Sequence, residues 1–264
     1  RRARGGNVTN TLTVLAQLGH ACAWLGTLAD DAASGLILAD LARHGIDATR
    51  AVRLPDTTTP TSYIALSRAT GSRTIVHFRD LPELDAAAFA SVPLSGIEWV
   101  HFEGRAPAET RRMLQIARAR LPGALLSVEL EKPRPGIEAR LDGPDLILAG
   151  RAFAEAHGFT APLDFLNDLG MRSSAGLCVL GWGAQGAYYR VRDGLTGQVQ
   201  ARAPARVLDT LGAGDCLNAG IIDGLLRGLP PAEAVAHAVR LAGFKCGHPG
   251  LDGLVTAARD AGWL

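Results

Sequence analysis

The sequence contains very little lysine and cysteine, and both shortages exclude kinds of site. Its two lysines, Lys132 and Lys245, do not follow a glycine, which excludes a phosphate-binding loop that ends in Gly-Lys. The four cysteines lie far apart in the sequence, without the paired spacing of a zinc site or of a disulfide framework. Small reduced thiols are the better interpretation, and they predict a cytoplasmic protein.

Long apolar runs and an excess of one charge are also missing. No apolar run reaches the roughly 18 residues that span a bilayer, and no charged and then apolar leader opens the sequence. Lys and Arg number 27 against 26 Asp and Glu, so no overall field attracts nucleic acid or an acidic membrane. With 47% hydrophobic residues over 264 positions, we expect a compact enzyme or binding protein for small molecules.

The order of apolar patterns predicts an α/β fold. Segments rich in branched and apolar residues alternate with segments of helical spacing, which indicates a mostly parallel central sheet with helices on both faces. A late antiparallel pair is expected over 188–192 and 199–202. The expected strands are 99–102, 125–130, 145–149 and 177–181, and the expected helices are 10–18, 32–44, 108–121, 215–227 and 231–246.

A β-hairpin interrupts this alternation. Residues 62–66 and 74–78 are strand-like and flank Ala69-Thr70-Gly71-Ser72, a turn sequence. The segment has too little apolar mass to form a domain. We therefore expect residues 58–81 to form a small flap, and residues 1–57 and 82–264 to form the core.

One glycine-rich segment has the superficial pattern of a dinucleotide-binding turn. Gly181-Trp182-Gly183-Ala184-Gln185-Gly186 follows an expected strand, but the residues after it are β-prone. No helix N-terminus is then available for a pyrophosphate, and no acidic residue follows at about twenty positions for a ribose. Gly183, Ala184, Gln185 and Gly186 could still place backbone against a nucleotide.

A second glycine-rich segment has stronger chemistry. In Asp209-Thr210-Leu211-Gly212-Ala213-Gly214-Asp215, the small residues Gly212, Ala213 and Gly214 let backbone N–H groups converge at the start of an expected helix. Such a turn forms an anion hole suited to a phosphoryl group. Asp215 beside it could take a proton from a hydroxyl. The alternative is that Asp215 only caps the helix.

Two asparagines near the start form a candidate sugar site. Asn7 and Asn10 are three residues apart, follow Gly6, and would share one face of a helix. Their amides could pair with neighbouring sugar hydroxyls. Asparagine is also a common helix cap, so this pattern is weak by itself.

Taken together, these motifs resemble the ribokinase-like (PfkB) carbohydrate kinases, and within that family the members that phosphorylate ketohexoses. The fold implied is a three-layer α/β/α sandwich with a β flap. The matching strings are Gly5-Gly6-Asn7 with Asn10, Gly71 to Ile75, His101 to Arg105, Val128 to Pro133, Asp209 to Asp215, and Lys245 to Gly247 with Asp252-Gly253.

The resemblance implies an ATP-dependent kinase for a ketohexose, most simply one that converts fructose to fructose 1-phosphate with Mg²⁺. Asp215 would be the catalytic base, and Gly6, Asn7 and Asn10 would hold the sugar. Arg73 on the flap would contact the ATP phosphates, as would the Gly183–Gly186 turn and the anion hole. The flap would also form a homodimer.

Two departures from the family pattern leave alternatives open. The family often has Asn-x-x-Glu near the metal, where this sequence has Ala149 and Ala152, so the metal ligands are unknown, with Glu129 or Glu131 as candidates. The family also begins with a strand that carries a sugar-binding aspartate, and we expect such residues ahead of Arg1. The alternatives are a kinase for another sugar or a nucleoside, and a non-catalytic sensor.

Overall fold

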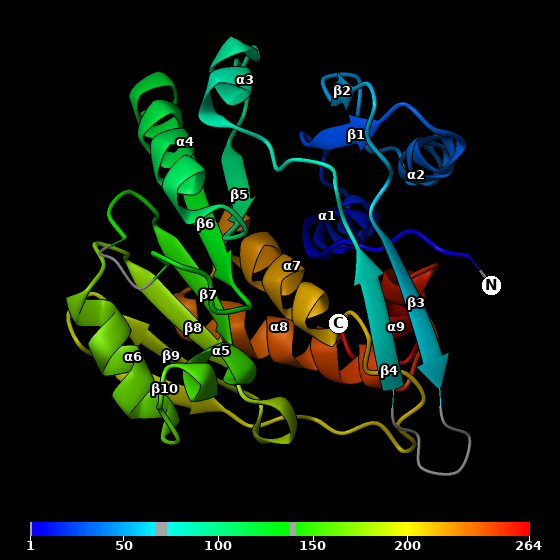
Figure 1. The fold of residues 1–264 in the computed structure, drawn as a ribbon. Coiled ribbons are helices and arrows are strands. Elements are labelled where there is room, and N and C mark those ends of the chain that lie inside the picture. The colour runs from blue at the N-terminus through cyan, green and yellow to red at the C-terminus, as the bar shows by residue number, and fades with distance from the viewer. Residues whose placement is uncertain (1, 67–72, 138–140) are drawn as a thin grey trace.

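The computed structural model describes residues 2–66, 73–137 and 141–264. A six-stranded sheet lies at its centre (Figure 1). The strand order is β10-β9-β8-β7-β6-β5. Strands β5 to β8 are parallel, whereas β9 and β10 are antiparallel to their neighbours. The strands are β5 (Trp99–Glu103), β6 (Leu125–Leu130), β7 (Leu146–Gly150), β8 (Leu177–Gly181), β9 (Ala187–Val191) and β10 (Thr196–Val199).

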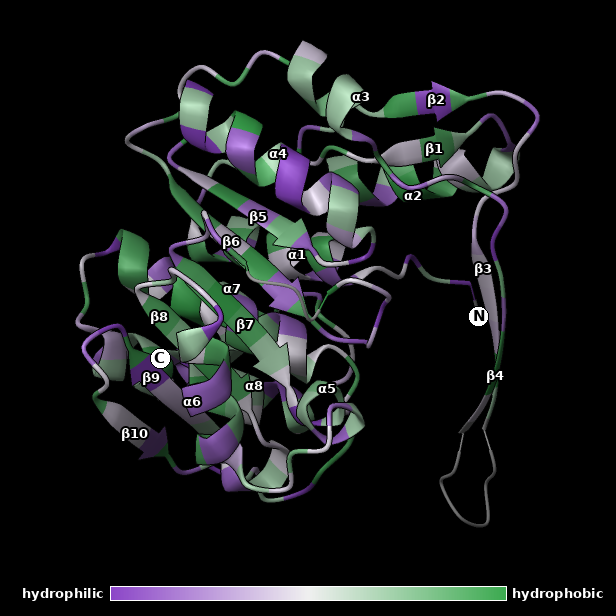
Figure 2. Ribbon diagram, turned by 60° about the vertical axis from the view of Figure 1, so that its left-hand side comes forward, coloured by the Kyte–Doolittle hydropathy of each residue, from purple (hydrophilic) through white to green (hydrophobic). Residues whose placement is uncertain are grey.

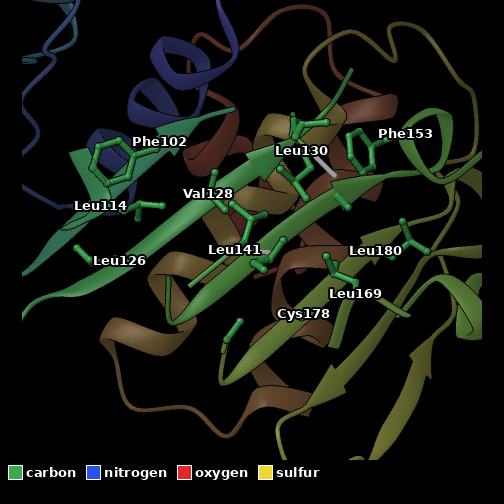
Figure 3. Close-up of a cluster of buried hydrophobic side chains, with 14 of the residues drawn as sticks. Phe102, Leu114, Leu126, Val128, Leu130, Leu141, Phe153, Leu169, Cys178 and Leu180 are labelled. Carbon is green, nitrogen blue, oxygen red and sulfur yellow. The ribbon is translucent and has the colours of Figure 1, made fainter. Parts of the chain in front are cut away.

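Helices cover both faces of this sheet. Side chains alternate along the buried strands. Val128 and Leu130 pack toward one helical layer (Figure 3), and Leu146 and Leu148 pack toward the other. The first layer contains α3 (Ala86–Ser91), α4 (Pro107–Arg120), α5 (Arg151–Ala156) and α6 (Pro162–Met171). The second contains α1 (Asn7–Leu18), α7 (Ala213–Leu226), α8 (Pro231–Cys246) and α9 (Leu254–Asp260). The predicted three-layer fold is confirmed.

Two small sheets lie outside the central one. Strands β1 (Thr27–Ala29) and β2 (Val52–Leu54) are parallel and flank α2 (Ala32–Arg43) in the sequence. Strands β3 (Thr61–Leu66) and β4 (Arg73–Phe78) form the expected antiparallel pair, which stands apart from the central sheet in Figure 2. The predicted turn at 69–72 lies outside the described residues. The limits of the flap at 58 and 81 remain a proposal.

Most expected elements are present, with shifts at their ends. Helix α1 starts at Asn7, three residues before the prediction, and ends at Gly19 in a left-handed conformation. The prediction for the second late strand was wrong by three residues. The turn after β9 closes early, since Val191 N donates to Leu195 O, and pairing resumes at Thr196.

The described part of the chain contains no helix that is long and apolar enough to cross a membrane.

Candidate active site

The ends of α1, α7, β6 and β8 border one large cavity of about 2660 Å³. Its volume exceeds the roughly 300–1,000 Å³ of a single small-molecule site, which leaves room for two substrates. Gln185 was predicted to belong to the site, but it does not line this cavity. The backbone of Arg73 begins β4, but its side chain is outside the description. The predicted residues that do line the cavity are Gly6, Asn7, Asn10, Gly183, Ala184, Gly186, Gly212, Ala213, Gly214 and Asp215.

The predicted anion hole forms the N-terminus of α7. Gly212 has φ of 84°, a left-handed conformation that favours glycine, and its carbonyl accepts from Cys216 N at 2.9 Å. The N–H of Ala213, which was predicted to join the anion hole, instead donates to Thr210 O at 3.3 Å. Within the described chain, the N–H groups of Gly212, Gly214 and Asp215 have no acceptor. A turn of free amides at the positive end of a 14-residue helix can bind an anion.

Asp215 lies in the first turn of α7 but does not cap it, because the cap residue is Gly212. Its side chain faces the second asparagine, and Asn10 Nδ2 donates to Asp215 Oδ2 at 2.7 Å. Only 7% of Asp215 is exposed. Burial raises its pKa to about 8 and the charge of Glu129 adds to the rise, although the Asn10 hydrogen bond lowers it. A carboxylate with such a pKa is suited to accept a proton near neutral pH.

Glu129 on β6 is a buried neighbour of this carboxylate. Its two oxygens accept from Asn7 Nδ2 at 3.2 Å and from Asn218 Nδ2 at 2.9 Å. Burial raises the pKa of Glu129 to about 7, as does the charge of Glu103, and the two amide bonds lower it. From the sequence, Glu129 is a candidate for metal binding only, although a carboxylate among the apolar residues of a strand also indicates a buried polar contact.

The loop before the anion hole is tied to α8 by an ion pair. Lys245 is fully buried, and its Nζ donates to Asp209 O, Asp209 Oδ2 and His248 O at 2.9, 2.9 and 3.1 Å. Asp209 also accepts from the backbone N–H groups of Leu211 and Gly250. No role for Lys245 was predicted from the sequence. The pair fixes the loop that leads into Gly212.

The Gly183–Gly186 turn lies between β8 and β9. It forms a short 3-10 turn followed by strand, as expected, and not the helix of a dinucleotide-binding motif. Gly186 has φ of 88°, and a Cβ atom there would lie 2.0 Å from Val199 O. Gln185 is held within the hairpin, because its side chain accepts from Tyr188 and its carbonyl from Gln198. Gly186 therefore permits close packing of the turn against Val199, as well as any contact with a ligand.

The acidic side chains near the cavity do not form a metal cage. No group of three or more His, Cys, Asp or Glu residues could hold an ion in the part of the chain that the structure describes. Glu103 accepts from Val8 N at 3.0 Å and pairs with Arg105. Glu131 is exposed, and its Oε2 lies 3.9 Å from Lys132 Nζ.

The mostly parallel sheet, the free amides at the N-terminus of α7 and the buried Asp215 carboxylate meet at one cavity, an arrangement typical of α/β enzymes that bind an anionic substrate. The model of the protein family described as "pfkB family carbohydrate kinase" matches residues 1–257. The chain belongs to this family and is a sugar or nucleoside kinase.

Individual relatives agree with this membership. The chain is similar to ketohexokinase of Mus musculus, with 35% identity over 97% of this chain and 88% of the relative. It is 26% identical to 2-dehydro-3-deoxygluconokinase of Bacillus subtilis (strain 168), over 98% and 86%. Among solved structures, adenosine kinase from Sinorhizobium meliloti has a TM-score of 0.79 and 25% identity, over 98% of this chain and 83% of that one.

Proposed function

We propose that the protein transfers the γ-phosphoryl group of ATP to a ketohexose, most simply to the 1-hydroxyl of fructose. One observation carries the proposal: the buried Asp215 carboxylate lies one residue from free helix amides and is hydrogen-bonded to Asn10. The 35% identity to ketohexokinase supports a ketohexose as the acceptor.

In the proposed reaction, Gly6, Asn7 and Asn10 bind the sugar. Asp215 takes the proton of the attacking hydroxyl as its oxygen forms a bond to the γ-phosphorus. The bond from that phosphorus to the bridging oxygen breaks, and ADP leaves with the electron pair. The free N–H groups of Gly212 and Gly214 stabilise the charge on the phosphoryl oxygens during transfer.

ATP enters as its magnesium complex and occupies the side of the cavity near the Gly183–Gly186 turn. Magnesium spreads charge over the phosphates when bound. Arg73 would add a guanidinium from the hairpin, a group well suited to phosphate oxygens. The four free cysteines fit a reducing, cytoplasmic location, which remains part of this proposal.

A panel of acceptors tests the substrate. With ATP and magnesium, we expect the highest kcat/KM for fructose or another ketohexose, measured by coupled ADP release. Ribose, 2-dehydro-3-deoxygluconate and adenosine are the alternatives, chosen because kinases of the same family act on several substrate classes. Turnover of ribose or adenosine without turnover of any ketohexose would overturn the assignment. ATP binding without any turnover would instead support a sensor.

We also propose that the β3–β4 hairpin forms a homodimer. Its apolar side chains Tyr63, Ile64, Ile75, Val76 and Phe78 are each more than half exposed. Strand register puts Tyr63 beside Val76, and Phe78 two positions along on the same face. Exposed apolar strands of this length are usually covered, and a second copy would present the same surface.

Val76→Asp should therefore shift the protein from a dimer to a monomer of 27.7 kDa. The added charge would have to be buried between two hairpins without a partner. Light scattering after gel filtration measures the mass. Met171→Asp on α6 is the matched control, because Met171 is also an exposed apolar residue but lies away from the hairpin. A wild-type monomer, or an unchanged dimer in Val76→Asp, would contradict this interface.

A further inference from the structure

Two buried charges hold the candidate sugar-binding asparagines from opposite ends. Asn7 Nδ2 donates to Glu129, and Asn7 Oδ1 has no partner within the described chain. Asn10 is held in the other sense: its Oδ1 accepts from Arg4 Nη1 at 3.2 Å, while its Nδ2 donates to Asp215. These residues all line the same cavity.

Both charges are themselves fixed. Only 9% of Glu129 is exposed, and its second oxygen accepts from Asn218. The Arg4 side chain is 5% exposed, and it donates to Asp40 Oδ2 at 2.6 Å and to Thr13 Oγ1 at 2.8 Å. Neither group can rotate away without leaving a buried charge unpaired, which is costly.

A charged partner restricts an amide more than a neutral one. Both oxygens of Glu129 accept from amide N–H donors, so Asn7 turns its NH₂ group toward Glu129 and its oxygen away. A guanidinium only donates, so Asn10 must turn its oxygen toward Arg4. A neutral amide in place of either charge would permit both orientations.

We propose, on the basis of the function proposed above, that Glu129 and Arg4 are positioning residues that fix the two amides in opposite senses. The sugar site then presents an acceptor, Asn7 Oδ1, next to a donor, the second N–H of Asn10 Nδ2. One sugar hydroxyl can donate to Asn7 Oδ1 while the adjacent hydroxyl accepts from Asn10 Nδ2. The pattern selects vicinal hydroxyls of one relative placement.

The experiment is a double-mutant cycle on sugar binding. Glu129→Gln keeps the shape of the side chain and its bond to Asn218, and it removes a buried charge, so the variant is expected to fold. We expect its KM for fructose to rise about tenfold with KM for ATP unchanged. In the Asn7→Ala background, the same substitution should change KM for fructose less than twofold. Glu155→Gln on α5, an exposed carboxylate paired with Arg151, is the matched control.

Arg4 gives an independent arm. Arg4→Met should raise KM for fructose, and Arg4→Lys, which keeps a cationic donor, should restore part of the loss. As a readout that a structural role would not move, deoxyfluoro ketohexoses replace one hydroxyl at a time by a group that cannot donate. Wild type should discriminate against the fluoro sugar whose hydroxyl donates to Asn7, and Glu129→Gln should lose most of that discrimination.

The outcomes separate this proposal from the function. If wild type phosphorylates no sugar, the proposed function fails. If Asn7→Ala leaves KM for fructose unchanged, or if Glu129→Gln has the same effect with and without Asn7, the positioning role fails while the kinase assignment stands. Failure of Arg4→Lys to improve on Arg4→Met would remove Arg4 from the proposal.

Discussion

Asp215→Asn is expected to lower kcat for fructose phosphorylation by about 10²–10⁴-fold, the typical contribution of a general base. The substitution keeps the size of the side chain and leaves the free amides of Gly212 and Gly214 in place, so ATP should bind with unchanged affinity by calorimetry. Asp164→Asn is the matched control, because Asp164 lies in the first turn of α6 away from the cavity. Loss of ATP binding together with turnover would show that Asp215 supports the loop and is not the base.

The same variant should be more stable than wild type at alkaline pH. The pKa of Asp215 rises from 3.8 to about 8 on folding, so the folded state holds this proton more tightly than the unfolded state. That contribution to stability is complete below about pH 4 and is lost as the pH rises through 8. Asparagine carries no such proton, so the melting temperature of Asp215→Asn should exceed that of wild type above pH 8 and approach it near pH 4. An equal difference in melting temperature near pH 4 and above pH 8 would contradict a pKa of Asp215 that burial raises.

Lys245→Met is expected to destabilise the protein by about 3 kcal/mol, toward the lower end of the cost of breaking a buried ion pair. The lysine is fully buried, but its partner Asp209 is one third exposed and can regain some solvation. The substitution also leaves the carbonyls of Asp209 and His248 without their donor. Urea unfolding measures the free energy of unfolding.

Lys132→Met is the natural comparison, because Lys132 is the only other lysine and is 64% exposed. We expect it to change the free energy of unfolding by less than about 0.5 kcal/mol. A similarly small change in Lys245→Met would show that the pair does not anchor the loop. If the pair does anchor it, kcat should also fall in Lys245→Met, since the loop leads into the anion hole.

Much of the fold could be predicted because its signals are local. Strands β7 and β8 are continuous apolar runs, and glycines end or start several helices, as Gly19 and Gly212 do. The β1–β2 sheet was missed because strands of three residues have no measurable alternation. The position of β10 was wrong because a tight turn, and not side-chain pattern, sets where pairing resumes.

The site divides in the same way. Asp215 and the Gly212–Gly214 turn are adjacent in sequence, so the motif predicts that they lie together, and both line the cavity. The residues that hold the rest of the site in place could not be recognised from the sequence. Glu129 meets Asn7 across 122 positions, and Lys245 meets Asp209 across 36, so only the fold brings each pair together.

The most direct test is phosphorus NMR of the purified protein with fructose, ATP and magnesium. Transfer to the 1-hydroxyl predicts a new phosphomonoester resonance that correlates with the two C1 methylene protons in a phosphorus–proton experiment, together with ADP, and neither signal with Asp215→Asn. Unchanged ATP, release of inorganic phosphate alone, or the same product from the Asp215→Asn variant would contradict the account.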